Sequence, residues 1–267
     1  MKQRKTLVFN HIPKTAGSTF LNILQKQYFN DEIYIIDAIN FSNSIRRFKK
    51  LSETERSRIK CITGHGTSLL FEDLKDPYEV VTFVRNPNET LISSYYYIKR
   101  ATWNKYHKDV VKMNSILEFI EFRKDLNLDN QQTRYLANSI DNLLLDTNPF
   151  CAVDELMYEK GLENLKLRKN GFTTEEFNFA VYKLYIELNW RKLPFYTMLN
   201  KTKNRSSINS YTDKELEAID SCNKYDKLIY DFVLKLQISE QKGLSFRDKL
   251  RHSAFYLSNS IYSNIRK

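Results

Sequence analysis

The segment HIPKTAGSTF at residues 11–20 combines a cation, hydroxyl groups and small side chains in a pattern suited to binding an anion. A loop of small residues that enters a helix directs backbone N–H groups to one point, and the helix N-terminus adds positive potential there. Lys14 adds a mobile cation, and Thr15, Ser18 and Thr19 add hydroxyl groups. The segment therefore predicts a phosphate or sulfate site, and the alternative is an ordinary strand–turn–helix corner with a surface lysine.

A second candidate anion site begins where the apolar run YEVVTFV, at residues 78–84, meets Arg85. A guanidinium at a strand end offers a planar fork of donors to an oxyanion. Ser93 lies inside the helix-like segment that follows, where it could face the same group. The alternative is an arginine that caps a turn and a serine on a helix surface.

Neither segment has the features of a nucleoside-triphosphate site that uses Mg²⁺. The loop lacks the spacing G-x-x-x-x-G-K-[ST], because Lys14 comes before Gly17 rather than after it. Arg85 and Asn86 also stand where phosphoryl transfer would place a metal-binding carboxylate. The two segments therefore favour a donor that is bound without a metal, such as a sulfuryl donor, and a phosphoryl transferase is the second interpretation.

A histidine stands between two glycines in the segment TGHG at residues 63–66. The segment follows the apolar pair at residues 61–62, so we expect His65 at an exposed strand end rather than in a core. A hydroxyl acceptor must lose its proton when it attacks, and imidazole accepts a proton near neutral pH. The segment therefore predicts a general base at His65, and a structural histidine is the alternative.

A polar segment, NQQTRYL at residues 130–136, is a candidate for acceptor binding. Gln131 and Arg134 are three residues apart, which places them on one face of a helix. Both side chains can bind sugar hydroxyls or carboxylates. The alternative is a solvated polar helix.

Short apolar runs alternate with helix-like segments in the first half of the chain, and from about residue 112 the sequence is mostly helical in pattern. A strand, a small-residue loop and a helix form the opening of an α/β nucleotide-binding unit. We therefore expect one α/β domain at residues 1–240. The predicted strands, which are short and rich in β-branched and aromatic side chains, are residues 6–11, 32–38, 60–64 and 78–84.

Residues 241–267 predict a basic amphipathic helix of different character. We favour docking of its apolar stripe on the same domain, and peripheral contact with an anionic membrane is the alternative. The stripe consists of Phe246, Leu250, Ala254, Leu257 and Ile261. The positive charges of the helix come from Arg247, Lys249, Arg251, Arg266 and Lys267.

The charge balance is basic, with 42 Lys and Arg against 32 Asp and Glu and a formal net charge of +10. The excess favours an anionic partner, although base composition of the genome explains it equally well. The basic residues are spread along the chain rather than clustered with aromatic ones, so we expect no nucleic-acid partner. A polyanion-binding protein without catalysis is nevertheless an alternative. Scattered cysteines, no secretory signal pattern and no long apolar run lead us to expect a cytoplasmic protein.

Together, the segments at residues 11–20 and 85–93 resemble two motifs of the carbohydrate sulfotransferases (sulfotransferase family 2), which include the heparan sulfate O-sulfotransferases. The 5′-phosphosulfate loop of that family reads close to H-I-P-K-T-A-G-T-S, and its 3′-phosphate motif reads R-D-P-x-x-R-x-x-S. The resemblance implies a P-loop-like three-layer fold with a central parallel sheet. It also implies sulfuryl transfer from 3′-phosphoadenosine 5′-phosphosulfate (PAPS), without a metal, to a hydroxyl of a glycan or glycolipid acceptor.

The resemblance also assigns roles to single residues. Lys14 would hold the bridging oxygen and stabilise the leaving phosphate, and His65 would be the catalytic base. Some relatives use a carboxylate as the base, which leaves Glu72 and Asp73 as alternatives. The remaining donor contacts would be Thr15, Ala16, Gly17, Ser18 and Thr19 at the 5′-phosphate, and Arg85 and Ser93 at the 3′-phosphate.

Two positions depart from the pattern of the family. Asn86 stands where Asp is usual, and Thr90 stands where a second Arg is common. Loss of that arginine would either weaken donor binding or move a salt bridge, so Thr90 has no assigned role. Residues 130–136 resemble an N-x-Q-T-R-x-L element that borders the cofactor and acceptor cleft in bacterial relatives.

Overall fold

The structure is a computed structural model that describes residues 5–38, 40–138, 151–168, 170–199, 206 and 208–266. It divides into two compact units, and we describe each by itself. Unit 1 comprises Met1–Val84, Arg168–Asn200 and Val233–Lys267, and unit 2 comprises Arg85–Leu167 and Lys201–Phe232. The domain boundary expected at residue 240 lies inside helix α12 (Lys224–Gly243).

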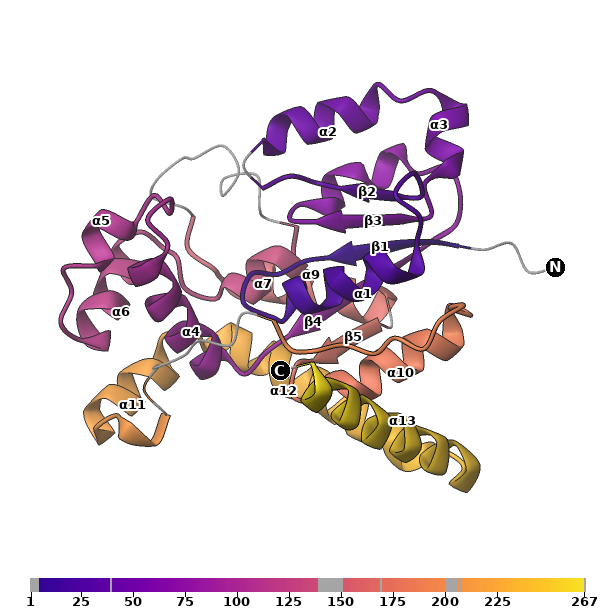
Figure 1. Cartoon of the computed structure of the whole chain (residues 1–267). Helices are drawn as coiled ribbons and strands as arrows, with labels where there is room; N and C mark the ends of the chain where they lie inside the picture. The colour runs from indigo at the N-terminus through magenta and orange to yellow at the C-terminus, as the bar shows by residue number, and fades with distance from the viewer. Residues whose placement is uncertain are drawn as a thin grey trace. The chain divides into compact units, whose positions relative to one another are not determined.

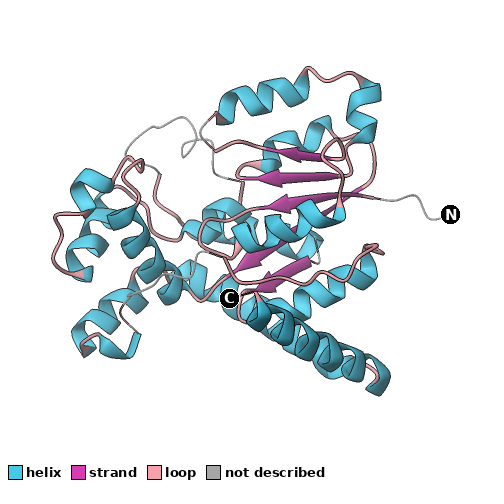
Figure 2. Ribbon diagram, viewed as in Figure 1, coloured by secondary structure: helices cyan, strands magenta, loops and turns pink. Residues whose placement is uncertain are grey.

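Unit 1 contains a five-stranded parallel sheet of order β2-β3-β1-β4-β5 (Figures 1 and 2). The predicted α/β fold with a central parallel sheet is confirmed, and each of the predicted strands is present. β1 lies at the centre, where the strand order reverses, and in such sheets ligands bind beside the carboxyl end of the strand at this point. The strands are β1 (Thr6–Asn10), β2 (Ile33–Ile35), β3 (Cys61–Gly64), β4 (Tyr78–Val84) and β5 (Asn170–Thr173).

β5 was not expected, because the second half of the chain has a mostly helical pattern. Its sequence, NGFT, contains asparagine and glycine, which are depleted in strands. The strand forms because β4 offers a partner: Phe83 lies opposite Phe172 in the register, and Phe172 is buried. Long-range pairing rather than local propensity therefore determines this strand.

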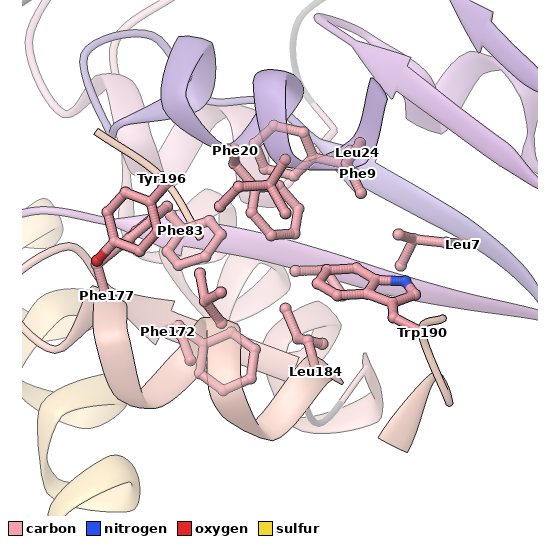
Figure 3. Packing of buried hydrophobic residues seen from close by; sticks show 14 of the residues in the cluster. Leu7, Phe9, Phe20, Leu24, Phe83, Phe172, Phe177, Leu184, Trp190 and Tyr196 are labelled. Carbon is pink, nitrogen blue, oxygen red and sulfur yellow. The ribbon is translucent and has the colours of Figure 1, made fainter. Parts of the chain in front are cut away.

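Helices cover both faces of this sheet. Side chains alternate along β1, so Leu7 and Phe9 enter one core and Val8 enters the other. In the first core Phe20 packs edge-on against Phe9 and Phe83, with ring centroids 4.7 and 5.0 Å apart (Figure 3). The helices of unit 1 include α1 (Gly17–Gln27), α2 (Phe41–Lys49), α3 (Glu53–Arg58), the 3-10 helix η1 (Thr67–Asp73), α10 (Phe177–Glu187) and α13 (Phe246–Ile265).

Unit 2 is helical where the structure describes it. Its core joins the apolar faces of four helices, and its buried members include Leu91 of α4, Val110 of α5, Phe119 of α6 and Ile219 of α11. Besides the first part of α12, its elements are α4 (Pro87–Arg100), α5 (His107–Val110), α6 (Ile116–Asp125), α7 (Gln131–Leu136), α9 (Glu155–Arg168), η2 (Ile208–Ser210) and α11 (Asp213–Ser221).

Helix α13 docks on unit 1 as expected, but through the face opposite to its aliphatic stripe. Phe255 enters the core, and Asn259 Oδ1 accepts a hydrogen bond from Tyr196 N at 2.9 Å. The stripe faces outward, and Leu257, for example, is 63% exposed. The expectation about the docked face is wrong, because the side chains that make the contact, Phe255 and Asn259, lie opposite the stripe. None of the helices in the described ranges is long and apolar enough to span a bilayer.

Candidate functional site

The loop between β1 and α1 has a strained backbone. Lys14 and Ala16 both adopt left-handed conformations, with φ of 68° and 62°, which costs a residue other than glycine roughly 1 kcal/mol or more. The Thr15 hydroxyl braces the loop by donating to the carbonyl of Ile12 at 2.8 Å. Left-handed residues in a turn direct successive N–H groups into a concave nest, which binds anions. The strain is therefore retained where the sequence predicts an anion site.

The N-terminus of α1 extends this nest. Its first helical hydrogen bond runs from Phe20 N to Ala16 O at 3.1 Å. The N–H groups of residues 17–19 come before that bond, and N–H groups at this position have no carbonyl partners inside the helix. The helix dipole favours negative charge at the same place. The loop and the first turn of α1 thus fit a phosphate or sulfate group.

The threonine hydroxyls of this loop serve its own structure. Thr15 is fully buried and bonded to the backbone of the loop. Thr19 is also buried, and its Oγ1 accepts a hydrogen bond from Leu199 N at 3.0 Å. The side chain of Ser18, in contrast, is exposed. Thr15 and Thr19 would therefore contribute to an anion site mainly through the backbone.

Gly17 is required by the side chain of His11. A Cβ added at Gly17 would lie 1.7 Å from Nε2 of His11. Only glycine therefore lets this imidazole lie against the first turn of α1. No role was expected for His11, because the pairing of a histidine with a glycine six residues later carries no general signal.

The rings of His11 and His65 form a stacked pair, with centroids 4.4 Å apart and an interplanar angle of 23°. His65 Nδ1 lies 2.7 Å from the carbonyl oxygen of His11. Because a carbonyl only accepts hydrogen bonds, Nδ1 carries the proton and the basic lone pair of the neutral ring lies on Nε2. The backbone of His11 thus selects the tautomer that a general base at Nε2 requires.

Both imidazoles are held neutral at physiological pH. Burial, together with the nearby His65 and the ammonium of Lys14, lowers the pKa of His11 to about 3. Burial also lowers the pKa of His65, and its hydrogen bond to the His11 carbonyl opposes this shift. His65 is therefore in the form that accepts a proton at pH 7, and the charge of Lys14 lies close to the pair.

The glycines on either side of His65 allow its position at the end of β3. Gly64 has φ of 137°, and a Cβ there would lie 2.7 Å from Cβ of Ile36. Gly66 has a left-handed φ of 70° and begins η1. In the register of the sheet Gly64 lies opposite Asn10, the last residue of β1. His65 therefore leaves the same edge of the sheet as the loop that contains Lys14.

The carboxylates considered as alternative bases lie elsewhere in unit 1. The carbonyl of Asp73 accepts a hydrogen bond from Arg56 Nη1 at 2.9 Å, and Asp73 Oδ2 lies 3.6 Å from Lys49 Nζ. Arg56 belongs to α3, which leads into the start of β3, whereas His65 follows the end of that strand. Glu72 has an exposed side chain. The geometry therefore favours His65 over either carboxylate.

In unit 2 the backbone of Arg85 is fixed by Gln132. Arg85 N donates to Gln132 Oε1 at 2.8 Å, and Gln132 Nε2 donates to the carbonyl of Arg85 at 2.9 Å. The guanidinium lies 3.1 Å from Glu89 Oε2. A phosphate bound to Arg85 would therefore compete with this carboxylate. Gln132 was not among the expected site residues, although it lies inside the polar segment at residues 130–136.

Helix α4 explains both departures from the family's pattern. Asn86 caps the helix, since its Oδ1 accepts from Asn88 N and Glu89 N at 3.0 and 3.3 Å, a role that Asp fills equally well. Thr90 is buried and donates to the carbonyl of Asn86 at 3.0 Å, so this position is a structural one. Ser93 is also largely buried, one turn beyond Glu89 on the same face of the helix.

A family comparison decides the identity of the protein. The model of a family described as the sulfotransferase family matches residues 1–243. The chain belongs to the sulfotransferase family. A crystal structure of the mouse sulfotransferase SULT7A1 complexed with PAP is similar to the structure of this sulfotransferase, with a TM-score of 0.44. The two sequences are 13% identical, and the match covers 82% of this chain and 83% of that chain. No curated protein sequence matches the chain.

In this sulfotransferase the motif at residues 130–136 joins two helices by reciprocal caps. The carboxylate of Asp226 accepts from Gln132 N at 3.1 Å and from Thr133 N and Oγ1 at 2.7 and 2.8 Å. In return, Asn130 Oδ1 accepts from Tyr225 N and from Asp226 N at 2.8 and 3.2 Å. Burial raises the pKa of Asp226 while these hydrogen bonds lower it. The polar residues of this motif are therefore largely structural.

The face expected to join Gln131 and Arg134 is not formed. Arg134 is 2% exposed, donates from Nη2 to the carbonyl of Asn127 at 2.7 Å and lies 3.7 Å from Asp129 Oδ1. Gln131 is partly exposed. A buried, paired guanidinium holds the interior of unit 2 and does not reach an acceptor from this position.

Proposed function

We propose that this sulfotransferase uses PAPS as donor and a carbohydrate hydroxyl as acceptor, with His65 as the general base. The observation that carries the proposal is the 2.7 Å contact between His65 Nδ1 and the His11 carbonyl. It leaves the lone pair on Nε2, beside a loop that is built for an anion and contains Lys14. A base and an oxyanion site on one sheet edge are what acyl- and sulfuryl-type transfers to hydroxyls need.

Each residue at this edge has a distinct part in the reaction. His65 accepts the proton of the acceptor hydroxyl at Nε2 while the hydroxyl oxygen attacks sulfur. As the new O–S bond forms, the bond from sulfur to the bridging phosphate oxygen breaks, and 3′-phosphoadenosine 5′-phosphate (PAP) leaves. Lys14 and the N–H groups of residues 17–19 stabilise the charge that develops on the phosphate. His65 then returns its proton to solvent.

We assign the 3′-phosphate of the donor to Arg85 and Ser93. Arg85 is supported by its guanidinium, which can bind two phosphate oxygens at once, and by the Gln132 hydrogen bonds that fix its backbone. A phosphate carries more charge than the carboxylate of Glu89 and would displace it. This contact would distinguish PAP from AMP, which lacks the 3′-phosphate.

The carbohydrate acceptor, as a free glycan or a glycolipid, is supported by the motifs shared with the carbohydrate sulfotransferases and by the net charge of +10, which attracts acidic glycans. Gln131, whose side chain is partly exposed, is the proposed contact to acceptor hydroxyls. Transfer of radiolabelled sulfuryl from PAPS to a panel of glycans, a glycolipid and a tyrosine peptide tests this assignment. Labelling of the peptide alone would contradict it.

Calorimetric titration with PAP, with AMP as the matched ligand, tests the donor. We expect PAP to bind at least about tenfold more tightly than AMP, and Arg85→Ala to remove this preference. Lys14→Ala should weaken the binding of both ligands. Lys214→Ala, which removes the same charge from the exposed surface of α11, should change neither affinity. Equal affinity for PAP and AMP in the unmodified protein would contradict the proposal.

A further inference from the structure

Helix α13 presents a continuous apolar face to solvent. Its exposed members recur at intervals of four and seven residues, which places them on one side of the helix. Each is more than half exposed, from 54% for Ile261 to 79% for Ile265. Large apolar faces of this kind on a folded protein mark interaction sites. We call this surface the α13 stripe, and it consists of Phe246, Leu250, Leu257, Ile261 and Ile265.

The α13 stripe cannot be buried by rotation of the helix, because the opposite face is fixed to unit 1. Phe195 stacks on Phe255 and on Tyr262, with ring centroids 6.0 and 5.5 Å away. Asn259 accepts a hydrogen bond from Tyr196 N at 2.9 Å. Figure 1 shows α13 alongside α10 of the same unit. The helix is a docked element whose outer face is left to another partner.

The charges around the α13 stripe are basic. At about 100° per residue, Arg247 and Arg251 border one edge of the stripe and Lys249 borders the other. Asp248 Oδ2 accepts a hydrogen bond from Oγ of the N-cap residue Ser245 at 2.6 Å, and Asp248 Oδ1 lies 3.8 Å from Arg251 Nη1. Positive charge thus lies on both sides of the N-terminal half of the stripe.

We propose that the α13 stripe binds the interface of an anionic lipid bilayer, with the helix parallel to the membrane plane. Apolar side chains reach the acyl boundary and flanking Lys and Arg reach anionic headgroups in helices that bind in this way. A second copy of the chain is the other candidate occupant, and light scattering distinguishes it. The helix also lies beyond residues 1–243, which the sulfotransferase family model matches, so this function is separate from sulfuryl transfer.

Flotation of the purified full chain with lipid vesicles tests the proposal. The probes are vesicles of equal parts phosphatidylglycerol and phosphatidylcholine, and vesicles of phosphatidylcholine alone. We expect binding to the anionic vesicles at low salt, and binding at least about tenfold weaker to the neutral ones. A paired Leu257→Glu and Ile261→Glu variant should lose flotation, and paired Arg247→Gln and Arg251→Gln should weaken it severalfold.

The control is Leu156→Glu, which changes a leucine that is 74% exposed on α9 and should float like the unmodified protein. Thermal unfolding of each variant verifies that it is folded. Light scattering tests whether a second copy of the chain covers the stripe. The proposal would be overturned if the protein dimerised with concentration, the paired Leu257→Glu and Ile261→Glu variant did not, and no flotation occurred. Equal flotation with anionic and neutral vesicles, or none at low salt, would also overturn it.

Discussion

Two polar motifs that look equally functional in the sequence behave differently in the structure. In unit 1 the loop at residues 11–19 keeps a strained backbone, and a hydrogen bond through Nδ1 orients His65. In unit 2 the motif at residues 130–136 is buried, and the carboxylate of Asp226 accepts several of its donors. The first motif retains backbone strain beside a helix N-terminus, and the second gives its hydrogen bonds to neighbouring helices.

The difference shows how to separate a functional polar motif from a structural one. Donors and acceptors that satisfy each other inside the protein stabilise the fold, and they have little capacity left for a ligand. Strain in a loop between two regular elements persists only where the surroundings over-determine it, as they often do at functional sites. Substitutions in unit 1 should therefore reduce activity, and substitutions in the caps of unit 2 should reduce stability.

The largest effect is expected for Lys14→Ala. If this cation stabilises the leaving phosphate as we propose, its removal should lower kcat for sulfuryl transfer by about 10² to 10³. The temperature of unfolding should remain close to that of the unmodified protein, because Lys14 is partly exposed. Steady-state kinetics with PAPS and calorimetric unfolding are the measurements. A stability loss large enough to account for the lost activity would remove the contrast between the two motifs.

Asp226→Ala should show the opposite pattern in unit 2. It leaves the N–H groups of Gln132 and Thr133 buried without their acceptor, which should lower the free energy of unfolding by about 2 to 4 kcal/mol. Asp226→Asn keeps an acceptor oxygen and should lose less than half as much. Urea unfolding measures both variants. Equal losses would mean that the reciprocal caps do not stabilise this unit.

Gly17→Ala tests the packing of His11 against α1. The added methyl group would overlap the imidazole, whose Nε2 would lie 1.7 Å away, so His11 must move. We expect a stability loss of about 1 to 3 kcal/mol and a further loss of kcat, because the His65 tautomer depends on the position of His11. The double variant Gly17→Ala with His11→Ala should regain stability, because the imidazole that overlaps the new methyl group is absent. Full activity in Gly17→Ala would contradict the role given to His11.

As the pH falls, His11 and Asp226 should change the free energy of unfolding in opposite directions. His11 has a pKa of about 3 when folded and about 6.5 when unfolded. The unfolded chain therefore binds more protons in this range, and stability falls as pH falls from about 6.5, by at most about 1.4 kcal/mol per pH unit. Burial raises the pKa of Asp226, so this carboxyl group changes the free energy of unfolding in the opposite direction. Urea unfolding at pH 7 and pH 5 should show a smaller loss in His11→Gln than in the unmodified protein, and equal losses would contradict this.

Local sequence patterns predicted strands β1 to β4 and the candidate residues beside them, but not β5. Short apolar runs are sufficient to locate β1 to β4, and Lys14 and His65 follow the ends of two of these runs. The roles of His11 and Gln132 depend instead on partners 54 and 47 residues away. Such pairings are fixed by the register of a sheet and the docking of a helix, which a single sequence does not reveal. Arg134 was expected to face an acceptor but is buried, and its burial is likewise a tertiary property.

His65→Ala, assayed together with PAP binding, tests the central claim most directly. His107→Ala is the matched control, because His107 Nδ1 also lies 2.8 Å from a backbone carbonyl but has no role in the reaction. We expect His65→Ala to bind PAP with unchanged affinity, to lose sulfuryl transfer by about 10² to 10⁴, and to regain part of it with added imidazole. Sulfuryl transfer at the unmodified rate in His65→Ala would contradict the assignment of His65 as the base.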